Sequence, residues 1–167
     1  MADLETYIEL LIAKDEAAFE AVYHQTKHSV YAMIVSMVKD RSAAEDLMQD
    51  TYIKMIASIR QYDPKRNFTT WLLTIARNLA IDELRKRKRE QPVDPMESEN
   101  IFPKTEAKGE TDLLVEEYLM RLDEDERQVF LLHIVDNMKH REIAKIVDKP
   151  LGTVLWLYQK ALRKIKK

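Results

Sequence analysis

Three residues on one predicted helix carry side chains of the kind that bind metal ions. Glu20, His24 and His28 recur at intervals of four, so they would share one helix face. Carboxylate and imidazole groups ligate zinc and iron, but a di-iron bundle needs a second Glu-x-x-His pair, which the sequence lacks. An exposed polar stripe explains the three residues as well. We therefore predict no metal site and no cofactor.

Other constellations that could perform catalysis are missing from the sequence. The chain has no cysteine, which excludes disulfides, thiolate metal sites and cysteine nucleophiles. Gly109 and Gly152 are its two glycines, which leaves little room for a phosphate-binding loop or a nucleophile elbow. These features predict a protein that is not an enzyme.

The densest cluster of charge is a run of five cations, Arg85, Lys86, Arg87, Lys88 and Arg89. Positive charge near a helix C-terminus suits the helix dipole, but five consecutive cations exceed what capping requires. A solvated helix end is one interpretation of the run. Contact with a polyanion is the other, and the clustering favours it.

The element that must position these cations is a helix predicted over residues 67–89. The segment contains no Pro or Gly, and its apolar residues recur at helical spacing. Those residues are Phe68, Trp71, Leu72, Ile75, Leu79 and Leu84. One face of this helix should therefore pack on a core, with Phe68 and Trp71 mostly buried.

The composition is that of an ordinary soluble globular protein, with 46% hydrophobic and 34% charged residues and a net charge of −2. Charge is segregated, because residues 82–90 and 160–167 are basic while residues 94–112 are acidic. The N-terminus lacks the basic segment of a secretory signal, and no apolar stretch is long enough to span a bilayer. We predict a cytoplasmic protein without membrane insertion.

Nearly all of the first 90 residues are predicted to be helical. Helices are expected over residues 3–13 and 15–39, with Asp15 as the cap of the second. The pattern Ser42-Ala-Ala-Glu45 resembles a capping box and predicts a third helix over residues 42–60, with Ile53 among its inward-facing residues. Asp63-Pro64 then marks a turn before the basic-ended helix.

The remainder of the chain is predicted as a linker followed by a second helical group. Residues 91–111 contain three prolines, a glycine and scattered acids without an apolar period, as linkers do. Helices are expected over residues 112–122, 124–136, 139–147 and 153–166, the second capped by Asp123 with Glu126 and facing inward with Ile134. The last two helices form a helix-turn-helix pattern.

The predicted fold class is therefore all-α, with two small helical domains joined by a flexible linker and a helix-turn-helix in the second. The domains are expected at residues 1–90 and 112–167, with the linker at 91–111.

The sequence resembles the extracytoplasmic-function sigma factors, the promoter-recognition subunits of bacterial RNA polymerase, over almost its full length. The residues that carry the resemblance in the first domain are Ala18-Phe19, Val22-Tyr23, Ala44-Glu45-Asp46-Leu47, Gln49-Asp50, Tyr62-Asp63, Phe68, Trp71-Leu72, Ile75-Ala76-Arg77-Asn78, Asp82 and Arg85. Those in the second are Leu122, Arg127-Gln128-Val129-Phe130, Glu142-Ile143-Ala144, Gly152-Thr153-Val154 and Ala161.

The resemblance implies a role for each matching residue. Core polymerase would be bound by Asp46, Leu47, Gln49 and Asp50. The minus-ten element would be opened by Asn78, by the loop residues Lys65, Arg66 and Asn67, and by the aromatic Tyr62 and Trp71, with Arg77 nearby. The run 85–89 would hold phosphates. The minus-thirty-five element would be read by Thr153, Gln159, Lys160 and Arg163. An anti-sigma factor that sequesters the protein until a stress signal arrives is also expected.

The last helix departs from the family pattern. Lys or Arg usually follows Gly-Thr-Val, whereas this chain has Leu155-Trp156-Leu157-Tyr158. Direct readout of bases needs hydrogen-bond donors, so minus-thirty-five recognition would be weaker, shape-based or shifted along the helix. The apolar stretch could instead belong to an anti-sigma interface.

Two other functions fit parts of the sequence. A stand-alone helix-turn-helix regulator would bind DNA without polymerase and usually as a dimer. A helical adaptor that binds only protein would leave both basic segments unused. Promoter recognition by a polymerase subunit accounts for both segments, and it is our prediction.

Overall fold

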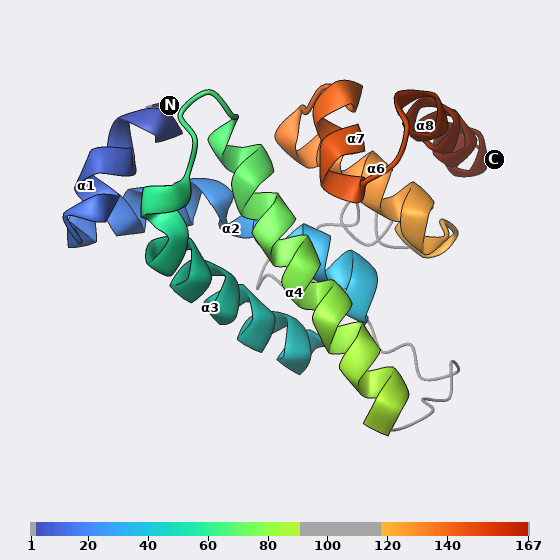
Figure 1. Cartoon of the computed structure of the whole chain (residues 1–167). Helices are drawn as coiled ribbons and strands as arrows, with labels where there is room; N and C mark the ends of the chain where they lie inside the picture. The colour runs from blue at the N-terminus through green and yellow to red at the C-terminus, as the bar shows by residue number, and fades with distance from the viewer. Residues whose placement is uncertain (1–2, 91–117, 167) are drawn as a thin grey trace, which may run out of the picture.

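The computed structural model describes residues 3–90 and 118–166, and this part of the chain is helical (Figure 1). The first group of helices comprises η1 (Leu4–Tyr7), α1 (Ile8–Ile12), α2 (Glu16–Val38), α3 (Arg41–Ser58), η2 (Ile59–Gln61) and α4 (Phe68–Glu90). The second comprises α6 (Glu124–Asp136), α7 (His140–Val147) and α8 (Leu151–Lys166). The predicted linker 91–111 and most of the predicted helix 112–122 lie outside the described residues.

Side-chain caps start both α2 and α3. The carboxylate of Asp15 accepts from the amide of Ala18 at 2.8 Å and begins α2, as predicted. The start of α3 was predicted wrongly at Ser42. Asp40 is the cap there, because its extended backbone places the carboxylate 3.2 Å from the amide of Ala43.

The core of the first group lies between α2, α3 and α4. Val22, Met55 and Leu72 are fully buried in it, one from each helix. The hydroxyls of Tyr52 and Thr26 meet at 2.6 Å and join α3 to α2. The long helices α2 and α3 both pack against α4, whose last turns extend beyond them (Figure 1).

The predicted capping box opens α6. The Asp123 side chain accepts from the Glu126 amide, and the Glu126 side chain accepts from the Asp123 amide, both at 3.0 Å. Buried Arg127 donates to the carbonyl oxygens of Leu119 and Leu122, at 3.1 and 2.9 Å, and holds the preceding segment against α6. Its guanidinium therefore has a structural role in the described chain.

The two groups pack against each other. Helix α6 lies along α2, and α7 lies against α4. Met33 of α2 and Leu131 and Leu132 of α6 are buried, and they line a small enclosed space between the two helices. Helix α8 contacts α6 and α7 and occupies the edge of the molecule far from α1 (Figure 1).

Two apolar residues predicted to face inward lie at the surface instead. Ile53 of α3 is 68% exposed and Ile134 of α6 is 55% exposed. Each lies on a helix whose opposite side already fills the core, through Tyr52 and Met55 in α3 and through Val129 and Leu132 in α6.

None of the described helices has the length and apolarity that a bilayer crossing requires.

Candidate nucleic-acid and protein interfaces

One stripe of exposed residues runs along α4. Trp71, Asn78 and Arg85 are spaced by seven residues, or about two helical turns, so they lie on the same side of the helix. Asn78 and Arg85 are exposed and Trp71 is half-buried. An aromatic ring, an amide and a cation in a line offer stacking, hydrogen bonding and phosphate binding in sequence along one strand of nucleic acid.

The loop before α4 is held by its own side chains. The Asn67 carboxamide oxygen accepts from the amide of Thr70 at 3.0 Å and caps α4, and the Asp63 carboxylate accepts from the amide of Lys65 at 3.0 Å. The hydroxyl of buried Tyr62 donates to the carbonyl of Arg66. Lys65 and Arg66 remain exposed at the loop surface. The loop is therefore shaped before any ligand arrives.

Three aromatic rings support this loop. The centroid of the Tyr62 ring lies 5.5 Å from that of Phe68 and 5.1 Å from that of Trp71, and the Phe68 and Trp71 centroids are 5.7 Å apart. Phe68 is buried, as predicted, whereas Trp71 keeps part of its ring at the surface. Burial, and secondarily nearby carboxylates, raise the pKa of Tyr62, which keeps its hydroxyl protonated as a donor. Of the three rings, Trp71 is the one that a base could reach.

Arg77 is half-buried on α4. Its Nε atom is buried, and its charge acts on Glu124 at the start of α6. Burial, and then the Asp125 carboxylate, raise the pKa of Glu124, and the cations of Lys39, Arg127 and Arg77 partly offset that rise. Arg77 is therefore less open to solvent than Asn78, the residue that follows it on α4.

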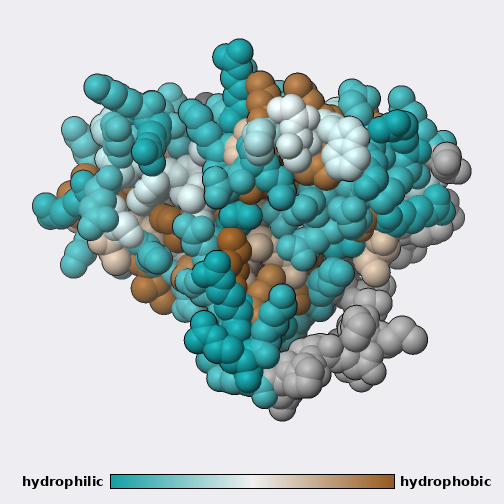
Figure 2. All heavy atoms as spheres, turned by 45° about the vertical axis from the view of Figure 1, so that its right-hand side comes forward, coloured by the Kyte–Doolittle hydropathy of each residue, from teal (hydrophilic) through white to brown (hydrophobic). Residues whose placement is uncertain are grey.

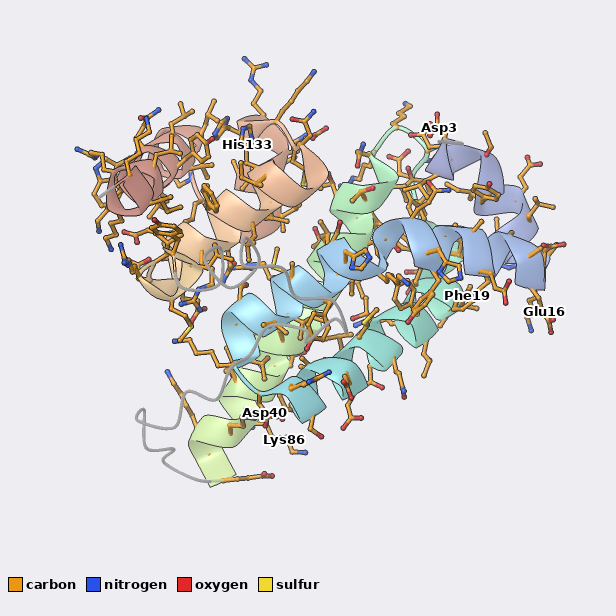
Figure 3. The ribbon with its side chains drawn as sticks, turned by 180° about the vertical axis from the view of Figure 1, so that it is seen from behind. Asp3, Glu16, Phe19, Asp40, Lys86 and His133 are labelled. Atoms are coloured by element: carbon orange, nitrogen blue, oxygen red, sulfur yellow. The ribbon has the colours of Figure 1, made fainter. Side chains whose placement is uncertain are left out.

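The five cations at the end of α4 divide into two kinds. Arg87 pairs with Asp40 at 3.1 Å and with Glu83 at 3.2 Å, so it fastens α4 to the start of α3. In Figure 3, Asp40 and Lys86 lie close together at this end of the molecule. The exposed cations are Arg85, Lys86, Lys88 and Arg89. These four are available for phosphates.

The exposed face of α3 carries three of the four residues expected to bind polymerase. Asp46, Gln49 and Asp50 are exposed, whereas Leu47 is only 7% exposed and packs in the core. Ile53, which the apolar pattern predicts to face inward, continues the same exposed face one turn beyond Gln49. The exposure of Ile53 adds an apolar residue to this face of α3, which the sequence pattern did not indicate.

An apolar groove of about 930 Å³ borders this face of α3. Its lining includes the aromatic Phe19, Tyr23 and Tyr52 together with Ile53. Acidic Glu16 and Glu20 of α2 flank it, and Figure 3 shows Glu16 and Phe19 along α2 where it runs beside α3. Lys14 and His24 line the groove as well, and an exposed apolar surface with such a polar rim suits a protein partner.

Helix α8 exposes Thr153, Gln159 and Arg163 of the four residues expected to read DNA. Lys160 is engaged within the protein, because its Nζ lies 3.1 Å from Oε1 of Glu126 and 3.9 Å from Oδ2 of Asp123. Leu157 is buried and therefore cannot belong to a surface interface here.

Buried Glu126 of α6 holds α8 in place through two of its lysines. Its carboxylate accepts from Nζ of Lys164 at 2.7 Å and pairs with Lys160, while it also caps α6. Burial alone would raise the pKa of Glu126, but hydrogen bonds from Lys164, the Asp123 amide and Lys160 outweigh it and lower the pKa. The carboxylate is therefore charged at neutral pH and ties α8 to α6.

The residues first considered as metal ligands, Glu20, His24 and His28, are all exposed on α2. Within residues 3–90 and 118–166, no group of three or more His, Cys, Asp or Glu side chains is arranged to hold a metal ion.

Comparison with known proteins gives two family matches in the order of the helical groups. Residues 22–90 match sigma-70 region 2, and residues 112–165 match sigma-70 region 4. The ECF RNA polymerase sigma factor SigW of Bacillus subtilis is 29% identical over 154 residues, which cover 84% of this chain and 82% of SigW.

Solved structures share the fold. The sigma factor RpoE of Bartonella quintana, in complex with the anti-sigma factor NepR, superposes with a TM-score of 0.73 and 24% identity, covering 89% of this chain and 94% of RpoE. CnrH, in complex with the cytosolic domain of CnrY, superposes with a TM-score of 0.69 and 18% identity, covering 99% of this chain and 96% of CnrH.

A protein that carries regions 2 and 4 in this order serves transcription initiation by bacterial RNA polymerase, to which its domains bind together with promoter DNA. The chain belongs to the extracytoplasmic-function sigma factors. The region 2 match, which a stand-alone helix-turn-helix regulator would not need, favours this conclusion over that alternative.

Proposed function

We propose that residues 1–90 bind core polymerase and open the minus-ten element, and that residues 112–167 bind the minus-thirty-five element across a linker at 91–111. The observation that carries the first assignment is the line along α4 of half-buried Trp71 and exposed Asn78 and Arg85. A flipped base needs a polar edge and a stacking surface at one place, and the phosphate beside it needs a cation. The line supplies all three.

Asn78 has the central part in this proposal. Its amide both donates and accepts, so it pairs with the edge of an unstacked base. Trp71 stacks on the base or its neighbour, and the preformed loop 63–67 borders the pocket. The exposed cations of the run 85–89 hold phosphates, which fixes the register of the strand without specifying its sequence.

The exposed face of α3 binds the polymerase in this proposal. Asp46, Gln49 and Asp50 contact polar and basic groups of the partner, and exposed Ile53 supplies an apolar contact beside the groove. A buried apolar contact ringed by polar ones is the common anatomy of such interfaces.

Two matched amide variants test this division of roles. Asn78→Ala should lower open-complex formation at least tenfold while the affinity for core polymerase stays within twofold. Gln49→Ala should weaken core binding and leave promoter opening normal at saturating concentrations. Core affinity is measured by titration with labelled protein, and opening by permanganate reactivity of thymines. Loss of both properties together in Asn78→Ala would contradict the assigned role.

Membership of this family also suggests where the protein acts and how it is regulated. The protein acts in the cytoplasm, performs no catalysis of its own and serves genes of a stress response. A protein inhibitor sequesters it until a signal arrives, a suggestion supported by the complexes of RpoE with NepR and of CnrH with CnrY. The tagged protein is isolated from unstressed cells, and the fraction free of core polymerase is separated from the fraction bound to it. An inhibitor should be found in the fraction free of polymerase.

A further inference from the structure

The outward face of α8 has an unusual chemistry for a helix that reads DNA. Opposite the buried Val154, Leu157 and Ala161, a set of exposed residues shares one side of the helix. They are Gly152, Leu155, Trp156, Gln159, Arg163 and Lys166. Figure 2 brings this side of the molecule forward, and apolar side chains gather there among hydrophilic ones. The beginning of this face is apolar and its end is basic.

The cations that usually read guanine are absent from the beginning of the face. Lys160 is held by Glu126 and lies 4.9 Å from the ring centroid of Trp156. Lys164 is held by Glu126 as well. The first cation on the outward face is Arg163, which lies roughly 18 Å along the helix axis from Leu151 at 1.5 Å per residue. The first three turns therefore offer no bidentate donor for guanine.

The first three turns offer apolar groups and an amide instead. Leu155 is 45% exposed and Trp156 is 54% exposed. Gln159 follows Leu155 by one turn, or roughly 6 Å, which is about the rise of two base pairs. An A·T pair presents the thymine methyl group and the adenine N6 and N7 atoms in the major groove, and these match an apolar side chain and an amide.

We propose that α8 reads A·T pairs of the minus-thirty-five element, with Leu155 and Trp156 packed on thymine methyl groups and Gln159 bound to adenine. This inference rests on the proposed function of residues 112–167. Buried Glu126 acts as a positioning residue, because it holds Lys160 over the Trp156 ring and so fixes the indole at the surface.

Charge complementarity favours DNA over a protein as the occupant of this face. Helix α8 contains no acidic residue, and its outward face ends in Arg163 and Lys166. The neighbouring α7 exposes Arg141 and Lys145. A rim of cations alone complements phosphates. At Gly152, an added Cβ would meet no atom within 4 Å, so the helix backbone is open to close approach there.

Thymine-to-uracil replacement tests the inference, because it removes only the methyl group. Promoters are first obtained by run-off transcription on genomic DNA with the reconstituted holoenzyme. Each thymine of the minus-thirty-five element is then replaced singly by deoxyuridine, and holoenzyme affinity is measured by competition. At one or two positions the loss should be about fourfold, the value of one buried methyl group.

Matched variants assign the methyl contact to α8. In Leu155→Ala, or in Trp156→Ala, the fourfold effect of uracil should vanish at the position that the deleted side chain contacts. Ile134→Ala, which removes an equally exposed apolar side chain from α6, should retain the full uracil effect. Both readouts use the whole chain in the holoenzyme.

Three results would overturn the inference. Indifference to uracil at every minus-thirty-five position, with normal transcription, would refute methyl readout and leave the proposed function intact. Suppose that Leu155→Ala and Trp156→Ala both retain the uracil effect but lose binding to an inhibitor or to core polymerase. The outward face of α8 would then be a protein interface, and the inference would be wrong. Absence of any transcription or core binding would remove the proposed function, and this inference with it.

Discussion

Replacement of Glu126 by glutamine tests how α8 is held. Wild-type Glu126 has no exposed side-chain surface, and it pairs with Lys160 at 3.1 Å and Lys164 at 2.7 Å. A hydrogen bond to a charged group contributes about 1.5–3 kcal/mol, and the two lysines are more than a third exposed, so we discount each pair to about 1–1.5 kcal/mol. Glutamine can still accept from the Asp123 amide. Glu126→Gln should therefore lower the free energy of unfolding by about 2–3 kcal/mol.

Chemical denaturation at neutral pH, followed by circular dichroism, measures this loss. The control is Glu45→Gln on α3, whose partner Arg41 is 3.6 Å away at the surface. Breaking that exposed pair should cost less than about 0.5 kcal/mol. If Glu126→Gln proved as mild as Glu45→Gln, the ion pairs of Glu126 would not hold α8.

Comparing the free energies of unfolding of the wild type and Glu126→Gln at several pH values isolates the contribution of this one carboxylate. Because the pKa of Glu126 is lowered in the folded state from its ordinary value of 4.5, its stabilising effect is complete above pH 4.5. The effect is lost as the pH falls from that value toward the folded-state pKa. The difference in stability between wild type and Glu126→Gln should therefore shrink on acidification below pH 4.5, and an increase would contradict the assignment.

Two further predictions concern Gly152 and the basic end of α4. Gly152→Ala should stabilise the protein by about 0.5–1 kcal/mol in denaturant unfolding, because a helical glycine is costly and the new Cβ meets nothing; destabilisation would mean that this backbone is not an ordinary helix. Lys86→Gln with Lys88→Gln should reduce the slope of log affinity for promoter DNA against log salt by about 0.9 for each phosphate that the two lysines neutralise in the wild type. Lys54→Gln, an exposed lysine on α3, is the control and should leave the slope unchanged.

Local signals in the sequence located most helix boundaries correctly. Asp15 and the pair Asp123 and Glu126 begin helices as predicted, because a capping carboxylate acts within its own turn. The predicted start of α3 at Ser42 was wrong because a second capping residue, Asp40, lies two residues earlier. Its carboxylate accepts from the amide of Ala43. A choice between two competing caps depends on backbone angles that the sequence does not display.

Periodicity did not distinguish core faces from exposed apolar ones. Ile53 and Ile134 fit the apolar pattern of their helices, yet both are exposed because neighbouring residues already fill the interior. Leu47 differs in the opposite direction, because it belongs to the motif expected to bind polymerase and yet packs in the core. Spacing places a residue on a helix face, and only packing shows what that face meets.

Long-range charge pairs were beyond the reach of the sequence. Lys160 and Arg87 looked like free cations, but Glu126 and Asp40 hold them from 34 and 47 residues away. The packing of α6 on α2 and of α7 on α4 was likewise not predicted. Such contacts depend on how whole helices are arranged in space.

Run-off transcription on fragmented genomic DNA, with purified core polymerase and with or without this protein, tests the central claim most directly. A sigma factor should produce discrete start sites that require both the protein and the core, with two shared elements upstream. DNA binding by the protein alone, without core binding and without new start sites, would contradict the account.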